Sequence, residues 1–289
     1  MRVELTKHHG LGNDFLVLSD ALPALDLPAL DLPALARQWC DRRRGIGADG
    51  LLVMSAPAAD AEIVHEVRMT LFNADGSIAE MSGNGIRCFA QAWVMRHGLH
   101  DGAGLLRIIT DAGVRVVHVS PTGSDDTIEV SVDMGEVAAT AAPDGWEGVG
   151  CNPDRPVMHL SLGNPHTVVG VDEVDTVDLL ALGRQVPGTN LEIIEPGDGP
   201  HVIRMRVHER GAGITEACGT GACASAFAAR AWGLVAAGER EIVVHMDGGR
   251  ARVQLDEPAT GRVTLIGPSV YVGSITIDVS DQTQVQAVS

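Results

Sequence analysis

The sequence predicts an α+β fold in which two similar domains each place many short strands around one long helix. A stretch in the first third of the chain occurs again in the last third, and short apolar segments followed by a helix accompany both copies. The two copies are duplicated domains, because solenoid repeats span only about 20–50 residues. At 289 residues the chain can form two cores of ordinary size. Strands and helices do not alternate regularly, which argues against a doubly wound parallel sheet.

The repeat aligns without a gap when the sequence is shifted by 136 residues, the distance from Ser82 to Cys218. The identical pairs are Arg68/Arg204, Met69/Met205, Ile78/Ile214, Glu80/Glu216, Gly83/Gly219 and Gly85/Gly221. A second pairing, 151 residues apart, sets Leu11–Asn13 over Leu162–Asn164. The duplication therefore puts Ser82 at the position that Cys218 occupies in the second copy.

In the first half, apolar and alternating runs predict strands divided by polar turns. The strands are expected at Arg2–Lys7, Phe15–Leu18, Leu51–Met54, Glu66–Phe72, Leu105–Thr110 and Arg115–Ser120, and the helices at Pro33–Arg43 and Ile86–His97. Prolines at short intervals in Leu22–Ala34 indicate a loop. The polar segment Pro121–Asp126 is predicted to link the two domains.

The second half repeats this plan. Its strands are expected at Ile128–Met134, Val157–Leu162, Thr167–Val171, Leu191–Ile194, Val202–His208, Glu241–His245, Ala251–Leu255 and Val263–Leu265, and its helices at Val174–Gly183 and Ala222–Leu234. The last apolar run, Val270–Val279, is expected to return and complete the first domain's sheet. The predicted domains are therefore residues 1–121 with 267–279, and residues 122–266, followed by a tail at 280–289.

Composition and charge exclude several kinds of partner. A net charge of −17 argues against nucleic acid and anionic membranes. The sequence contains no apolar run long enough to span a membrane and no signal-peptide pattern. Five cysteines without the spacing of a disulfide scaffold favour a reducing cytoplasm.

The sequence also lacks the motifs of the common cofactor and metal sites. Lys7 is the only lysine, and an enzyme that uses pyridoxal phosphate needs one in its site. Lys7 ends a strand and is expected to be solvated, so we expect no cofactor. Neither Cys-x-x-Cys nor His-Glu-x-x-His occurs, and we expect no metal. The arginine-rich loop Asp41–Gly50 lacks the Lys-Ser/Thr of a P-loop, and a Gly-x-Ser-x-Gly hydrolase motif is missing.

Cys218 lies in a glycine-rich turn directly before a predicted helix. Backbone N–H groups and the positive helix end should converge beside its sulfur, which makes an anion site and is expected to lower the pKa of the thiol. A buried structural cysteine beside a tight turn is the alternative. Gly219 on the helix side leaves room for a ligand, whereas Cys223 is expected in the core.

Two helix N-termini, one bearing Ser82 and the other Cys218, are expected to face each other across a pseudo-dyad cleft. Such ends suit a carboxylate, with one side chain on each face of the adjacent carbon. This arrangement predicts proton removal from one face and delivery to the other. The carbanion would need a dry site with preorganised donors, and a thiolate is a suitable base once water is excluded.

Several motifs resemble those of the diaminopimelate epimerase family. They are Leu11–Phe15, Gly45–Asp49, Asn73–Phe89, Gly163–His166 and Glu209–Cys223, and the resemblance runs from about residue 3 to residue 279. It implies two pseudo-symmetric α/β-barrel-like domains, each a strongly bent, mostly antiparallel sheet around a central helix. It also implies a cofactor-independent conversion of LL- to meso-diaminopimelate, which serves lysine and peptidoglycan synthesis.

The resemblance also implies roles for individual residues. Cys218 would be one catalytic acid–base group and Ser82 stands at the position of the other. Backbone N–H groups would bind the α-carboxylate at Gly83, Asn84, Gly219 and Thr220. The distal amino and carboxylate groups would be held by Asn13, Asn73, Asn164, Asn190, Glu209 and Arg210. His166 and Glu209 would tune the pKa of the catalytic pair, and Tyr271 resembles a dimer contact, which implies a homodimer.

Ser82 departs from the family pattern, which has a cysteine directly before Gly83. A serine hydroxyl is a far weaker acid than a thiol, and serine is also a common helix N-cap. Three interpretations stay open: an engineered Cys-to-Ser form, a natural Ser/Cys variant that still epimerises, and a protein that only binds or that carries out one-base isomerisation or elimination. Cys88 lies too far into the helix to replace the missing thiol. The asparagines favour a second amino-acid head group, because a proline-like substrate would leave their amides unpaired.

Overall fold

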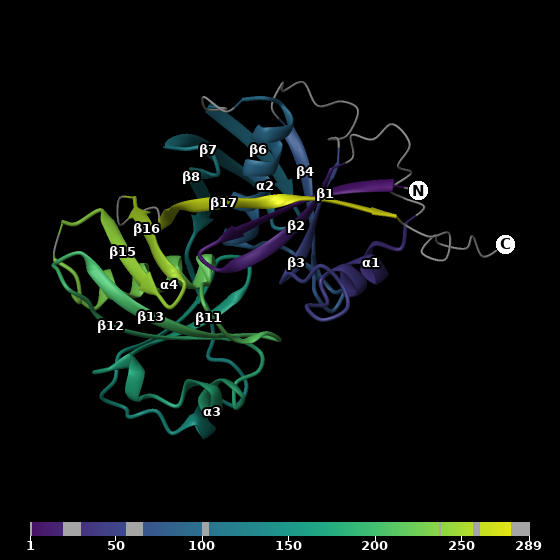
Figure 1. The fold of residues 1–289 in the computed structure, drawn as a ribbon. Helices are drawn as coiled ribbons and strands as arrows, with labels where there is room; N and C mark the ends of the chain where they lie inside the picture. The colour runs from purple at the N-terminus through teal and green to yellow at the C-terminus, as the bar shows by residue number, and fades with distance from the viewer. Residues whose placement is uncertain are drawn as a thin grey trace. The chain divides into compact units, whose positions relative to one another are not determined.

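The computed structural model describes residues 2–19, 30–55, 66–99, 104–236, 238–256 and 261–278 (Figure 1). The predicted loop Leu22–Ala34 falls largely outside these ranges, and the predicted tail at 280–289 falls wholly outside them. Within them the protein is a mixed α/β structure, as the sequence predicts. No helix in the described part of the chain is both long and apolar enough to cross a membrane.

The chain divides into two compact units. Unit 1 comprises Met1–Val130 and Pro268–Ser289, and unit 2 comprises Ser131–Gly267. Both divisions fall inside strands, namely β8 (Thr127–Glu136) and β17 (Arg262–Asp278). The predicted linker Pro121–Asp126 is wrong, because residues 121–124 extend strand β7 and residues 125–126 form the tight turn into β8. Gly, Ser and Asp favour hairpin turns as much as linkers.

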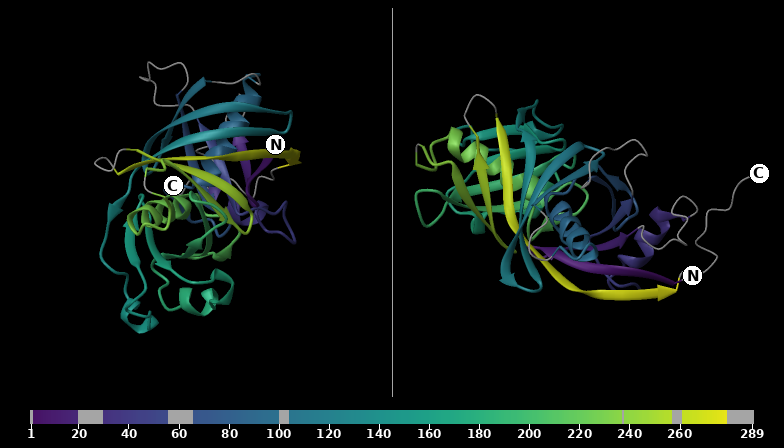
Figure 2. Two further views of the ribbon diagram at one scale, coloured as in Figure 1. Left: turned by 90° about the vertical axis from the view of Figure 1, so that its left-hand side faces the viewer. Right: turned by 90° about the horizontal axis from the view of Figure 1, so that it is seen from above.

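The described part of unit 1 contains two helices and a sheet whose strands pair largely in chain order. Its elements are β1 (Arg2–Gly10), β2 (Asn13–Ser19), α1 (Leu32–Trp39), β3 (Gly50–Ser55), β4 (Glu66–Asn73), β5 (Ile78–Ala79), α2 (Gly83–Arg96), β6 (Gly104–Thr110) and β7 (Gly113–Ser124). The pairs β1–β2, β3–β4 and β6–β7 are antiparallel, whereas β2–β3 and β4–β6 are parallel. The strands curve around α2, whose residues from Gly83 to Val94 are all buried (Figure 2).

Unit 2 repeats this topology around α4. Its further elements are β9 (Ala138–Ala139), η2 (Trp146–Val149), β10 (Val157–Ser161), β11 (Pro165–Gly170), η3 (Val174–Thr176), α3 (Leu179–Gly183), β12 (Asn190–Pro196), β13 (Val202–Glu209), β14 (Gly213–Thr215), α4 (Gly219–Ala231), β15 (Glu241–Met246) and β16 (Gly249–Leu255). The pairs β10–β11, β12–β13 and β15–β16 are antiparallel, and β11–β12 and β13–β15 are parallel. Strands β10 to β13, β15 and β16 all contact the small side chains of α4.

The helices differ from the prediction at both ends, and α4 ends at Ala231 instead of the predicted Leu234. Both α2 and α4 begin three residues earlier than expected, at Gly83 and Gly219, because Ser82 and Cys218 serve as their N-caps. The predicted helix Val174–Gly183 is divided into the short helices η3 and α3, and the Asp178 side chain caps α3 by accepting from the Ala181 N–H. Helix α1 ends at Trp39, before the predicted end at Arg43.

The C-terminal strand β17 confirms the predicted return to the first sheet and joins two predicted strands into one. Residues 263–266 pair antiparallel with β16 in unit 2, and residues 270–278 pair antiparallel with β1 in unit 1. The expected end at Val279 lies outside the described residues. Unit 1 therefore takes one of its strands from the far end of the chain.

Candidate active site

Ser82 and Cys218 occupy equivalent places, directly before the central helix of each unit. Both have extended backbone dihedrals and cap the helix with their side chains. Ser82 Oγ accepts a hydrogen bond of 3.0 Å from the Gly85 N–H, and Cys218 Sγ accepts one of 3.3 Å from the Gly221 N–H. Each side chain therefore lies beside the backbone N–H groups of a first helical turn.

The glycines of both first turns are required by close approach. A Cβ atom on Gly85 would lie 3.1 Å from the Ser82 Cβ, and one on Gly221 would lie 3.2 Å from Cys218 Sγ and only 2.7 Å from Glu192 Oε1. In unit 1 the fully buried Arg87 also fixes this turn, because its guanidinium donates to the Gly83 carbonyl at 3.1 Å. The Gly-x-Gly spacing thus reflects packing around the capping side chain.

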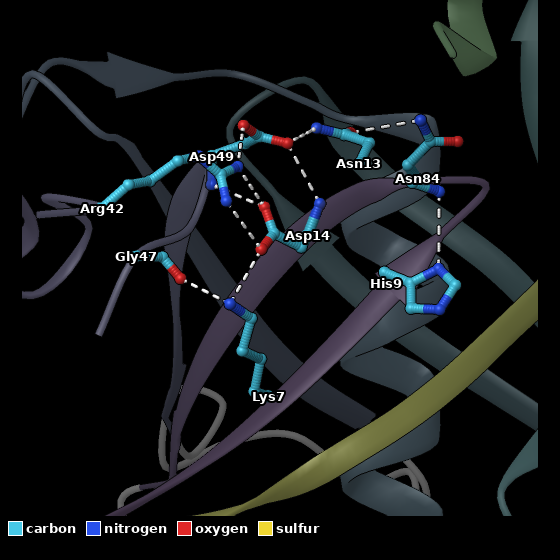
Figure 3. A network of polar contacts seen from close by, with 9 residues as sticks. Lys7, His9, Asn13, Asp14, Arg42, Gly47, Asp49 and Asn84 are labelled. Carbon is cyan, nitrogen blue, oxygen red and sulfur yellow. Dashed lines mark hydrogen bonds and ion pairs between the residues drawn. The ribbon is translucent and has the colours of Figure 1, made fainter. Parts of the chain in front are cut away.

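An asparagine from the preceding hairpin contacts the first turn of the helix in each unit. In unit 1, Asn84 Nδ2 donates to Asn13 Oδ1 at 3.1 Å, and Asn13 Nδ2 donates to Asp49 Oδ2 at 2.6 Å (Figure 3). In unit 2, Asn164 Nδ2 lies 3.2 Å from Thr220 Oγ1. Asn84 and Thr220 are equivalent positions in the repeat. Asn13 and Asn164 therefore contact the same position of the first helical turn in their respective units.

A cluster of charged side chains lies next to Asn13 (Figure 3). Arg42 forms ion pairs with Asp14 at 2.6 Å and with Asp49 at 2.7 Å, and Lys7 forms an ion pair with Asp14 at 2.9 Å. Lys7 also donates to the Gly47 carbonyl at 2.6 Å, and its side chain is only 19% exposed. The expectation that Lys7 is solvated is therefore wrong: its partners lie 7 and 40 residues along the chain.

The charge of Asp14 is stabilised by this cluster. Burial opposes its ionisation, but hydrogen bonds from Arg42 and Lys7 and the positive charges of both outweigh the burial. The pKa of Asp14 is consequently below its usual value. Asp14 is thus negatively charged at neutral pH, and Asp49 holds the turn by accepting the hydrogen bond from Asn13 Nδ2.

A different set of side chains supports Asn164 in unit 2. His166 Nε2 lies 3.0 Å from Asn164 Oδ1, and His166 Nδ1 lies 2.7 Å from Glu192 Oε1. The Thr220 hydroxyl is in turn 3.5 Å from Cys218 Sγ. An unbroken series of polar contacts therefore leads from a buried carboxylate to the thiol of Cys218.

The thiol of Cys218 is buried and protonated at neutral pH. Burial raises its pKa well above the ordinary value, and the neighbouring carboxyl groups of Glu209 and Glu192 raise it further. Hydrogen bonds from Thr220 and the Gly221 N–H act in the opposite direction without compensating. The expectation that the helix end lowers this pKa is wrong, because desolvation and the two carboxylates dominate. In this state the thiol can donate a proton, and it becomes a base only after losing one.

Glu209 and Asn190 lie on neighbouring strands of the same unit. Burial raises the pKa of Glu209, which hydrogen bonds from Thr215 and Cys218 partly offset. Asn190 Oδ1 accepts from the Arg210 backbone N–H at 2.8 Å, and the Arg210 side chain is exposed. Of these three residues, Glu209 contacts Cys218 at the N-terminus of α4, and Asn190 is joined to the residue after Glu209.

Asn73 and Tyr271 are more exposed parts of unit 1. Asn73 ends β4, where its Nδ2 donates to Ser77 Oγ at 3.0 Å. Tyr271 lies half-buried on β17, with its hydroxyl 2.9 Å from Ser274 Oγ. Cys88 and Cys223 are completely buried, as expected. No cluster of three or more His, Cys, Asp or Glu side chains suited to a metal occurs among the described residues.

Two supporting groups were not predicted from the sequence. Glu192 lies within the predicted strand Leu191–Ile194, and Asp49 lies in the glycine-rich loop and in the motif Gly45–Asp49, but neither pattern predicts a supporting role. A lone glutamate within the run Leu191–Ile194 is the signal that could have identified the first, because a charge in a buried strand needs a partner. No comparable local signal exists for the partners of Asp49.

The fold belongs to a class of known structures that includes epimerases. A PhzF-family phenazine biosynthesis protein of Bacillus anthracis superimposes with a TM-score of 0.72 at 15% identity, over 96% of this chain and 100% of that one. A hydroxyproline epimerase of Agrobacterium vitis, solved with trans-4-hydroxy-L-proline, gives a TM-score of 0.62 at 16% identity, over 96% of this chain and 91% of that one. At this identity the likeness shows the fold alone.

The sequence comparisons show the family. A diaminopimelate epimerase family model matches residues 5–140 and 158–272. Diaminopimelate epimerase of Halothermothrix orenii is 37% identical, covering 96% of this chain and 99% of that protein. The Streptomyces coelicolor enzyme of the same name is 39% identical, covering 96% of both chains. The chain belongs to the diaminopimelate epimerase family.

Replacing Lys7 with methionine should destabilise the protein in a pH-dependent way. The folded pKa of Asp14 lies below the unfolded value of about 4, so its charge stabilises the fold at neutral pH and this contribution is lost as the pH falls through the folded pKa. We expect Lys7→Met to lower the free energy of unfolding by about 1–3 kcal/mol at neutral pH. Urea denaturation should show this loss shrinking once Asp14 is protonated.

Arg2→Met is the matched control for Lys7→Met. Arg2 lies on the same strand, and its ion pair with Asp278 is exposed at both ends. Exposed pairs contribute little, so the control should unfold like the unaltered protein. Equal losses in the two variants, or a loss for Lys7→Met that does not change with pH, would contradict the role assigned to Lys7.

The Cys218 thiol should react slowly with iodoacetamide at pH 7. It is 5% exposed and its pKa is raised, whereas Cys151 is the one cysteine that is partly exposed. Mass spectrometry of Arg-cleaved peptides should find Cys151 alkylated first and Cys218 gaining reactivity as the pH rises. Alkylation of Cys218 as fast as that of Cys151 at pH 7 would show that the thiol is ionised and accessible.

Proposed function

We propose that this protein interconverts LL- and meso-2,6-diaminopimelate by proton transfer at the α-carbon, without a cofactor. The observation that carries the proposal is the pair of equivalent capping side chains, Ser82 and Cys218, each beside a glycine-rich first turn. Backbone N–H groups at a helix N-terminus favour a carboxylate ligand. Membership of the diaminopimelate epimerase family supports this substrate and a place in lysine and peptidoglycan synthesis.

We assign the α-carboxylate to the N–H groups of Gly83, Asn84, Gly219 and Thr220. The distal amino and carboxylate groups are assigned to Asn13, Asn73, Asn164, Asn190, Glu209 and Arg210. The exposed guanidinium of Arg210 suits a carboxylate, and amide oxygens suit an ammonium group. His166 and Glu209 are assigned to the tuning of the catalytic groups, because both lie in the polar surroundings of Cys218. In this proposal the two units serve as the two epimerase domains.

The proposed reaction needs two groups that exchange protons with one carbon. Cys218, protonated at neutral pH, is suited to deliver a proton to the carbanion, and its thiolate removes one in the reverse direction. Ser82 is assigned to the opposite face, where its hydroxyl can donate a hydrogen bond or a proton. A serine alkoxide is a much stronger base than a thiolate and is correspondingly harder to form at neutral pH, so this half of the reaction should be slow.

The proton transfer can be tested by NMR of LL-diaminopimelate in deuterated water. The unaltered protein should introduce deuterium at the α-carbon and form the meso isomer, and Ser82→Cys should be faster because a thiol ionises more readily. Cys218→Ala should lose about 10²- to 10⁴-fold in rate, the usual contribution of a general acid–base group. Cys223→Ala, a change at another buried cysteine of α4, should not.

The pattern of outcomes separates the alternatives. Activity only in Ser82→Cys would mean that Ser82 disables an otherwise ordinary epimerase. Exchange without inversion would favour a one-base reaction at Cys218, the second candidate function, which the weak acidity of Ser82 supports. Ligand-induced thermal stabilisation without exchange would indicate a binding protein. If neither the unaltered protein nor Ser82→Cys shows exchange, isomerisation or ligand-induced stabilisation, the proposed substrate is refuted.

We also propose a cytoplasmic homodimer that associates through the surface around Tyr271. Tyr271 is half-buried on β17, and the next residue, Val272, is an apolar side chain that is 57% exposed and that association would cover. The five free thiols fit a reducing compartment. Sedimentation velocity should give a dimer for the unaltered chain and for Val114→Glu, another exposed valine of unit 1, but a monomer for Val272→Glu. A monomeric unaltered chain would refute the dimer.

A further inference from the structure

We propose that Glu192 is a positioning residue for the Cys218 half of the site. With His166 it forms a buried pair that shares one extra proton and holds Asn164 against the first turn of α4. The catalytic consequence rests on the proposed function, whereas the protonation of the pair is a property of the resting protein. The two can therefore be tested separately.

The Glu192–His166 pair is enclosed in the interior of unit 2. Both side chains are 0% exposed, and Glu192 Oε1 lies 2.7 Å from His166 Nδ1. The other carboxylate oxygen, Oε2, has no hydrogen-bond partner among the residues that the structure describes. An isolated carboxylate would be very unfavourable here, so the pair must be close to neutral overall.

The hydrogen bonds determine where the protons are. Asn164 Nδ2 donates to Thr220 Oγ1, so the amide oxygen of Asn164 faces His166 Nε2. An amide oxygen only accepts, and His166 Nε2 must therefore carry a hydrogen. One further proton lies between His166 Nδ1 and Glu192 Oε1, as an imidazolium beside a carboxylate or as a neutral imidazole beside a carboxylic acid. Both forms are neutral and contain one proton more than a carboxylate with a neutral imidazole.

This pair acts on Cys218 through Asn164 and Thr220. A hydrogen on His166 Nε2 keeps the amide oxygen of Asn164 toward His166 and its amide nitrogen toward Thr220. The Thr220 hydroxyl in turn lies 3.5 Å from Cys218 Sγ. Glu192 also packs directly against this turn, since a Cβ atom on Gly221 would meet its Oε1 at 2.7 Å. The orientation of the first turn, and with it the surroundings of the thiol, therefore depends on the proton that Glu192 retains.

The pair is not required by the fold. Two residues after the asparagine of each hairpin, unit 1 has Phe15 where unit 2 has His166, and in the parallel strand pair that follows Leu52 takes the register position of Glu192. Phe15 is 4% exposed and Leu52 is completely buried, so two apolar side chains fill the same place. The acid–base pair thus distinguishes the cysteine-bearing unit from the serine-bearing one.

The protonation of the pair can be measured without substrate. In protein labelled with ¹⁵N-histidine, and with His166 identified by its absence in His166→Gln, both ring nitrogens of His166 should carry hydrogen or share one with Glu192. Glu192→Gln has the same shape but cannot supply the extra proton, so one ring nitrogen should become unprotonated. Glu195→Gln is the control, because Glu195 is a second buried carboxylate on β12 that pairs with Arg204 and the Val174 N–H instead.

Activity then tests the positioning role. Glu192→Gln should lower kcat by about 10- to 100-fold with little change in KM, as expected when a reacting group is displaced while the substrate's other contacts remain. Glu195→Gln should keep both constants, and Glu192→Asp should recover part of kcat. If the unaltered protein neither exchanges the α-proton nor epimerises diaminopimelate, the proposed function fails. The NMR measurement on His166 still tests the protonation of the pair independently. An unprotonated Nε2 in the unaltered protein, or full activity in Glu192→Gln, would overturn the proposal.

Discussion

The start of the central helix in both units depends on one hydrogen bond, which a side chain directly before the helix accepts from the backbone N–H three residues later. At Ser82 and at Cys218 this bond fixes where the helix begins, and it places the capping oxygen or sulfur beside the backbone N–H groups of the first turn. The glycines, the hairpin asparagine and the surrounding strands all fit this turn. In the proposed site the capping atom is also the acid–base atom, so a substitution at Ser82 or Cys218 also affects the start of the helix.

The duplication preserves this geometry but not its electrostatics. Next to Asn13, Asp14 and Asp49 form ion pairs with Arg42. Next to Asn164 lies His166, which contacts the buried carboxyl group of Glu192. Gene duplication supplies two similar turns, and divergence of the residues behind them gives each turn a different chemistry. Unit 2, which contains Cys218, is also the unit that contains the His166–Glu192 pair.

Burial decides the state of Cys218. A helix N-terminus is worth only about 0.3–1 kcal/mol at exposed sites, whereas burying an ionised thiol beside two carboxylates costs considerably more, and its pKa is raised. A substrate ammonium or carboxylate entering such a site changes this balance, because each alters the local charge. The same enclosure that makes the resting thiol inert also provides the dry surroundings that a carbanion requires.

The sequence by itself determined the duplication, the α+β class, the equivalence of Ser82 and Cys218, and the family, because these follow from residue identity and spacing along the chain. It misplaced both helix starts, since glycines lower helix propensity and hide the first turn that a cap stabilises. Only the tertiary structure decided that Lys7 is paired, that the Cys218 pKa is raised, and that Glu192 contacts His166. Each of these depends on groups far apart in the chain that strand pairing brings together in a water-poor interior, where a charge or a proton is governed by its neighbours in space.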